Sequence, residues 1–200
     1  EQDGEVAALL AVTWLHRARE VFLSGAELEQ QGARHISLLS HALFHACLER
    51  GKRMGSTLAA AVLRGGRLYV FGLGDSRIYL LSGRTLRRLT EDHTVAAEME
   101  QFGVSGPGGA AASDSHSHQL TQYFGMDDSE YDASPCHSSL PLEQGMRLLL
   151  CSDGLSGVVD EMTIAELLGR GAPEQTAKAL VNCALEAGGR DNITAMVLAV

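Results

Sequence analysis

The sequence lacks the short motifs that mark several large enzyme classes. It contains no GxxxxGK[ST] phosphate loop, no GxGxxG after a predicted strand and no GxSxG nucleophile elbow. Its four cysteines form no CxxC pair, and none of them has the sequence context of a nucleophile. The residues around Ser152 and Ser156 supply no His or Asp partner for a serine nucleophile. Without these motifs and nucleophiles, any chemistry of this chain is expected to depend on other side chains.

The sequence also lacks long apolar runs and basic clusters. No apolar run approaches the roughly 18 residues of a membrane helix, and the acidic start of the chain is the wrong flank for a signal peptide. A net charge of −9 argues against a general nucleic-acid binder, whose binding surface would be basic. Widely separated cysteines are typical of free thiols in a reducing compartment. We therefore expect a cytoplasmic protein with no membrane segment and no nucleic-acid partner.

The hydrophobic content and the order of the predicted elements indicate the fold class. With 200 residues and 45% hydrophobic residues, the chain is long enough for one domain with a sizeable core. Two helices come first, then a meander of short strands, then two more helices and a final strand. This order lacks the regular β-α alternation of a parallel sheet. We predict an α+β fold, a β-sandwich of two antiparallel sheets flanked by helices.

The individual elements follow from periodicity and turn residues. Leu9 and Val12 are among the apolar residues predicted to lie largely on one side of the first helix, and Leu48 is predicted to lie on the inner face of the second. Gly65-Gly66 predicts a hairpin. The predicted helices cover residues 5–22, 26–49, 92–102, 162–168 and 173–186, and the predicted strands cover 56–63, 67–72, 78–81, 86–89, 131–140, 147–152 and 192–200.

Three aspartates stand at the ends of predicted strands or loops. Asp153 follows the apolar run Leu148–Leu150, which predicts a buried strand, while Asp191 precedes the last strand and Asp92 lies in Glu91-Asp92-His93. A carboxylate at the tip of a buried strand is costly without a cationic partner. Adjacent strands that run the same way relative to the site would bring such carboxylates to one divalent ion. Aspartate before Gly or Asn also forms turns, and the residues alone leave that alternative open.

Two pairs of histidines offer a different kind of ligand. His41 and His45 are four residues apart and share a face of the second predicted helix, a spacing that can bind zinc. No third ligand is evident nearby, so a packed, partly polar helix face is the favoured interpretation. His116 and His118 fall in the Gly/Ala/Ser-rich segment 103–118, which predicts a flexible loop with solvated histidines.

Five motifs in a fixed order resemble those of the metal-dependent PP2C-type Ser/Thr protein phosphatases, the bacterial members above all. They span Gly51 to Val200. The motifs are Met54-Gly55-Ser56-Thr57-Leu58, Gly74-Asp75-Ser76-Arg77, Leu89-Thr90-Glu91-Asp92-His93, Leu150-Cys151-Ser152-Asp153-Gly154-Leu155 and Gly188-Gly189-Arg190-Asp191-Asn192-Ile193-Thr194.

The resemblance implies a function and a set of residue roles. The implied reaction is hydrolysis of phosphoserine or phosphothreonine in proteins, opposing a Ser/Thr kinase, by a water that two or three Mn²⁺ or Mg²⁺ ions activate. It casts Asp153 and Asp191 as catalytic through the paired metals that they hold, and Asp92 as a ligand, with Asp153, of a third and weaker ion. Residues 103–118 correspond to the family's flap beside the site. The fold implied is a sandwich of two antiparallel sheets with helices on both faces.

The chain departs from the family at its start. The family's aspartate-glycine motif before the first helix is not present, its upstream arginine is missing, and Asp3 stands in the wrong place to substitute. We expect residues 1–200 to be a single phosphatase domain without its N-terminal strand or strands, which binds metal weakly and hydrolyses little. The alternative is an inactive relative that serves as a regulatory or phosphoprotein-binding module. The persistence of Asp92, Asp153 and Asp191 favours the enzyme.

Overall fold

The computed structural model describes residues 4–17, 19, 27–49, 51, 53–103, 119–129 and 131–200. The chain forms two compact units: the first comprises Glu1–Leu58, Phe71–Asp75 and Asp92–His137, and the second comprises Ala59–Val70, Ser76–Glu91 and Ser138–Val200. Asp3, His116, His118 and the predicted flap beyond Gly103 lie outside the described residues. The prediction of a single phosphatase domain stays a prediction.

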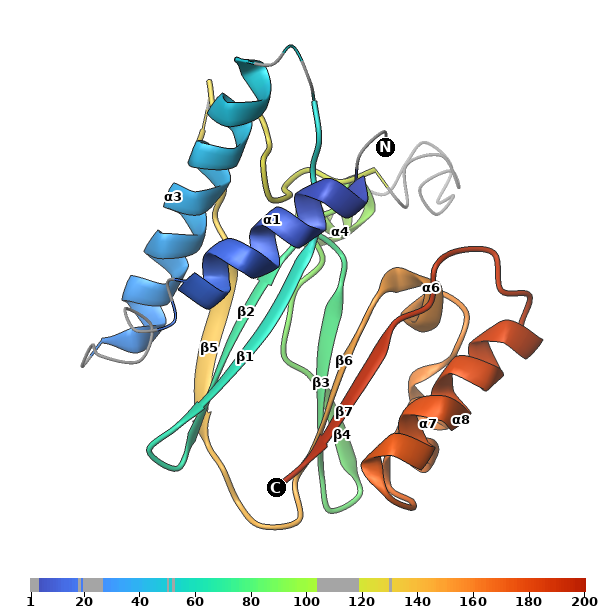
Figure 1. Ribbon diagram of the computed structural model, residues 1–200. Helices are drawn as coiled ribbons and strands as arrows, with labels where there is room; N and C mark the ends of the chain where they lie inside the picture. The colour runs from blue at the N-terminus through green and yellow to red at the C-terminus, as the bar shows by residue number, and fades with distance from the viewer. Residues whose placement is uncertain are drawn as a thin grey trace. The chain divides into compact units, whose positions relative to one another are not determined.

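A three-stranded sheet has the order β1-β2-β5 (Figure 1). Its strands are β1 (Leu58–Arg64), β2 (Arg67–Leu73) and β5 (Cys136–Pro141). Gly65 and Gly66 join β1 to β2 with φ angles of 56° and 71°, values that glycine adopts without strain. The predicted hairpin is therefore confirmed.

A four-stranded antiparallel sheet has the order β4-β3-β6-β7. Its strands are β3 (Arg77–Ser82), β4 (Thr85–Arg88), β6 (Arg147–Cys151) and β7 (Ala195–Ala199). The central pair β3 and β6 is in register through Tyr79 and Leu149. The buried strand predicted from Leu148–Leu150 is thus β6, with antiparallel neighbours on both sides.

Successive side chains of β6 enter different cores, because a strand alternates its faces. Leu148 packs in a cluster with Leu68 and Val70 of β2, which closes the space between the two sheets within the second unit. Leu149 packs in a separate cluster with residues of α7 (Glu161–Leu168) and α8 (Pro173–Glu186). Burial on both faces explains why the β6 sequence is a continuous apolar run rather than an alternating one.

The helices of the second unit begin where local sequence signals place them. Asp160 caps α7 by accepting a hydrogen bond from Thr163 N at 2.9 Å. Proline occupies the first turn of α8, where its missing N–H costs nothing. Ile164, Leu168, Leu180 and Ala184 of these helices are fully buried. Figure 1 shows α7 and α8 beside β6 and β7.

The first unit contains α1 (Gly4–Arg17), α3 (Leu28–Leu48) and α4 (Val95–Gln101), and α1 contacts α3. Leu9 and Val12, which belong to the apolar side of the first predicted helix, have side chains that are 67% and 64% exposed. The buried residues of α1 are Ala7 and Ala11 instead. The prediction that Leu48 lies on the inner face of the second helix is wrong, because Leu48 is exposed at the end of α3.

The α+β class with two sheets and accompanying helices is therefore confirmed. Within the described ranges, none of the helices combines the length and apolar character that crossing a bilayer requires.

Candidate functional site

Asp153 and Asp191 come together at one edge of the four-stranded sheet. Asp153 follows the last residue of β6 by two positions, and Asp191 precedes the first residue of β7 by four. The two strands are antiparallel, so the end of one lies beside the start of the other. The two carboxylates therefore approach each other across an antiparallel pair of strands, as the predicted antiparallel sheets allow. Figure 1 shows β6 running into the short helix α6 (Asp153–Ser156), with β7 beside β6.

The two aspartate segments approach so closely that only glycine fits at position 154. A Cβ atom on Gly154 would lie 2.4 Å from the carbonyl oxygen of Asn192 and 3.4 Å from Asp191 Cβ. Real Cβ atoms do not come that near to a backbone oxygen. The pair Asp153-Gly154, which the sequence alone also allowed as a simple turn, thus lies at a close contact between two segments that are distant in sequence.

Ser152 fastens the same two segments together. Its hydroxyl donates to the carbonyl oxygen of Asn192 and accepts from Thr194 N, both at 3.0 Å. Its backbone N–H donates to Thr194 O at 3.2 Å. Sequence reasoning considered Ser152 only as a nucleophile without partners and missed this positioning role. The sequence signal for this role is a small hydroxyl residue directly after β6, at the edge of the sheet where the neighbouring strand β7 begins.

Each carboxylate has one oxygen held by the backbone. Asp153 Oδ1 accepts from Gly154 N at 2.8 Å, and Asp191 Oδ1 accepts from Asn192 N at 2.6 Å. No residue in the described part of the chain makes a hydrogen bond or ion pair with either Oδ2. Asp153 is half-buried and Asp191 is exposed. An oxygen-only donor set with one oriented, available oxygen on each side fits Mg²⁺ or Mn²⁺.

The thiol next to this pair is unsuited to nucleophilic chemistry. Burial raises the pKa of Cys151 to about 11, although the nearby Arg77 guanidinium opposes the shift. The group therefore stays a protonated thiol near neutral pH. Chemistry at this edge of the sheet depends on the carboxylates.

Asp92 lies in the first unit, where its neighbour His93 anchors it. Gly74 N donates to His93 Nδ1 at 3.0 Å, and His93 N donates back to Gly74 O at 3.0 Å. Gly74 has a φ of 97°, and a Cβ there would lie 2.5 Å from Thr57 Cγ2. Residues of three motifs thus form one packed corner around Thr57, Gly74 and His93. The predicted meeting of Asp92 with Asp153 and Asp191, which belong to the second unit, stays a prediction.

Comparison with known sequences places this chain in a family. A family model described as Protein phosphatase 2C matches residues 1–188. The chain is 35% identical over 144 residues to the Ser/Thr protein phosphatase PstP of Mycobacterium tuberculosis, which covers 72% of this chain and 27% of PstP. It is 30% identical over 210 residues to protein phosphatase PhpP of Streptococcus pneumoniae, which covers 98% of this chain and 80% of PhpP. The chain thus spans little more than a quarter of the length of PstP.

Solved structures agree with the sequence comparison. The catalytic domain of PstP, solved with two manganese ions, superposes with a TM-score of 0.79 at 28% identity, over 96% of this chain and 80% of that domain. The Ser/Thr phosphatase of S. agalactiae superposes with a TM-score of 0.84 at 26% identity, over 98% of this chain and 81% of that one. The fold predicted from the sequence is therefore confirmed, and the chain belongs to the protein phosphatase 2C family.

Proposed function

We propose that this chain hydrolyses phosphoserine and phosphothreonine esters in proteins, in a metal-dependent reaction that opposes a Ser/Thr kinase. The observation that carries the proposal is the Asp153–Asp191 pair, held at one sheet edge by Gly154 and Ser152. Membership of the protein phosphatase 2C family supports it, as does the manganese in the related PstP domain.

The residue roles that we propose combine this pair with the family resemblance. Asp153 and Asp191 would hold Mn²⁺ or Mg²⁺ through their outward oxygens, and Asp92 would contribute to a third ion. Such ions, when bound, lower the pKa of a coordinated water and neutralise phosphate charge. The amides of Gly154 and Asn192 fix the second oxygen of each carboxylate and so set its orientation. The residues themselves bind and orient, and no side-chain nucleophile is required.

We further propose a cytoplasmic location. All four cysteines carry free thiols, and Cys47 and Cys151 are buried. Free cysteines are typical of reducing compartments. The opposing kinase and its phosphorylated target would then share that compartment with this chain.

The test is hydrolysis of a phosphothreonine peptide with Mn²⁺, together with Mn²⁺ binding measured by electron paramagnetic resonance. We expect slow, EDTA-sensitive phosphate release, with Asp153→Asn lowering both turnover and Mn²⁺ affinity by at least about 100-fold. Asp132→Asn is the matched control, since Asp132 is an exposed carboxylate of the first unit. Unchanged hydrolysis by Asp153→Asn would refute the ligand role. Phosphopeptide binding with no hydrolysis by the unaltered chain would support the non-catalytic module instead.

A further inference from the structure

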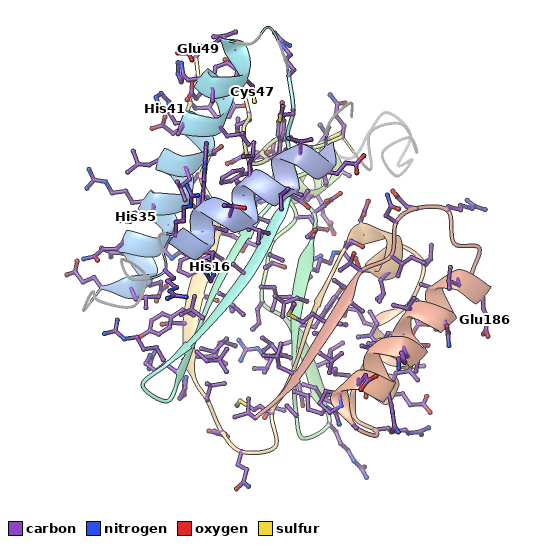
Figure 2. All side chains as sticks on the ribbon, in the orientation of Figure 1. His16, His35, His41, Cys47, Glu49 and Glu186 are labelled. Atoms are coloured by element: carbon purple, nitrogen blue, oxygen red, sulfur yellow. The ribbon has the colours of Figure 1, made fainter. Side chains whose placement is uncertain are left out.

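A second cluster of metal-ligating side chains lies in the first unit. His41 Nδ1 is hydrogen-bonded to Asp128 Oδ2, and His45 Nε2 lies 3.6 Å from Asp128 Oδ1. The two imidazole ring centres are 4.3 Å apart. Each of the three residues offers a ligand atom, and these atoms all lie within 4.8 Å of one another. Figure 2 labels His41 on the C-terminal half of α3, with His35 nearer the start of the helix.

The third ligand was invisible in the sequence. The shared helix face of His41 and His45 is confirmed, but Asp128 lies 87 residues beyond His41. Only the packing of the segment around Asp128 against α3 completes the set. The set adds a third ligand to the helix face, for which the sequence favoured a packed and partly polar role.

The segment that carries Asp128 is fixed to α3 by contacts other than those of the cluster. Gly125 N donates to Ser40 Oγ at 2.8 Å, one position before His41 on the helix. Phe124 is bridged to Ser56 by two backbone hydrogen bonds of 2.8 and 3.1 Å. These contacts involve protein atoms alone, so they reduce the ordering that metal binding has to supply.

The burial of the three side chains is asymmetric in a way that suits a metal. The Asp128 side chain is 10% exposed, whereas those of His41 and His45 are 53% and 51% exposed. The carboxylate is the most enclosed of the three groups, and about half of each histidine side chain faces solvent. Zinc bonds of about 2.0–2.2 Å in tetrahedral geometry place ligand atoms roughly 3.3 Å apart, so small side-chain rotations suffice. The exposed side leaves the fourth position to water.

We propose that His41, His45 and Asp128 form a zinc-binding site that ties α3 to the segment around Asp128. Imidazole nitrogen is a ligand that Zn²⁺ accepts well and Mg²⁺ avoids. The site thus differs in chemistry from the carboxylate pair on β6 and β7, and it belongs to neither the motifs nor the function proposed above. Its expected role is structural, because a metal that binds the folded chain and not the unfolded chain stabilises the fold.

The test is zinc titration of the metal-stripped chain by calorimetry, with His45→Ala as the variant. This variant keeps the His41–Asp128 hydrogen bond, so the chain should still fold. His35→Ala is the matched control, since His35 lies on the same helix and bonds to Gln31 O instead. We expect His45→Ala to weaken zinc binding by at least about 10-fold and to remove the zinc-induced rise in melting temperature. His35→Ala should retain both.

A second measurement keeps this test separate from the carboxylate pair. Co²⁺ in place of Zn²⁺ should give the visible absorption of a tetrahedral nitrogen and oxygen site, in the unaltered chain and in Asp191→Asn alike. His45→Ala should abolish it. Equal zinc affinity in the unaltered chain and His45→Ala, or no zinc binding at micromolar concentration, would overturn the proposal and leave an ordinary His–carboxylate contact.

Discussion

The two candidate metal sites differ in both donors and framework. Asp153 and Asp191 offer only oxygen and stand at the ends of neighbouring strands, so the register of one sheet brings them together. His41, His45 and Asp128 combine nitrogen with oxygen, and they come from a helix and a distant loop. A sheet edge collects ligands through backbone pairing, whereas the helix-and-loop cluster depends on side-chain packing.

The difference extends to rigidity. Backbone contacts hold the aspartate pair: Gly154 abuts Asn192, and the Ser152 hydroxyl bonds to residues on the other segment. The two imidazoles of the histidine cluster are about half exposed and can reorient. We therefore expect the first site to fail when its backbone is disturbed and the second to fail only when a ligand is removed.

The largest expected effect separates the two sites by chemistry. Asp191→Asn should reduce Mn²⁺ affinity and Mn²⁺-dependent phosphate release by at least about 100-fold, because one of the two oriented carboxylates loses its charge. Zinc affinity at the histidine cluster should stay within about twofold of the unaltered chain. His45→Ala should show the reverse pattern. Mn²⁺ resonance and zinc calorimetry on both variants check this. Loss of both Mn²⁺ and zinc binding in either variant would show that the two sites are not independent.

The second effect tests the backbone contact. Gly154→Ala places a Cβ 2.4 Å from the Asn192 carbonyl oxygen, and neither segment can yield without moving an aspartate. We expect a loss of about 1–3 kcal/mol in the free energy of unfolding by urea and a marked fall in Mn²⁺ affinity. Gly4→Ala is the control, because the nearest atom to its Cβ would be Gly55 O at 3.9 Å. Wild-type Mn²⁺ affinity in Gly154→Ala would contradict the close contact.

Sequence reasoning succeeded where a pattern is local. The run Leu148–Leu150 predicted the buried strand β6, and the predicted helix 173–186 coincides with α8. Periodicity did not reveal that α1 buries Ala7 and Ala11 while Leu9 and Val12 are exposed. Helical periodicity shows which residues share a side but not which neighbour that side will meet.

The same distinction applies to the sites. The aspartates were found because each stands beside a strand end with a recognisable motif. The antiparallel pairing of their strands agrees with the predicted fold, but the close contact of Gly154 with Asn192 was not predicted, since it depends on long-range packing. Asp128 was missed for the same physical reason: only the folding of its segment against Ser40 and His41 brings it to the histidines.

A smaller effect concerns the hydroxyl between the two aspartate segments. Ser152→Ala removes two hydrogen bonds and leaves the Asn192 carbonyl and the Thr194 amide to find other partners. We expect a loss of about 1 kcal/mol in unfolding free energy and a decrease of a few fold in Mn²⁺ affinity, with zinc binding unchanged. Ser156→Ala is the control, because its hydroxyl contacts its own segment, with a long contact of 3.5 Å to Ser152 O and a bond with the Cys151 thiol. Equal behaviour of the two variants would show that the hydroxyl does not position the pair.

The smallest effect should alter stability without altering either metal site. The backbone N–H of Thr163, and secondly its hydroxyl, lower the pKa of Asp160 at the start of α7. A depressed pKa in the folded chain means that this carboxylate stabilises the fold above its unfolded pKa, about 3.9, and that the contribution is lost as pH falls through the folded value. Asp160→Ala should therefore lower the melting temperature slightly at pH 7, and the difference from the unaltered chain should vanish in acid. Because Mn²⁺ and zinc affinities should both stay unchanged, this variant distinguishes a general loss of stability from the specific losses at the aspartate pair and the histidine cluster.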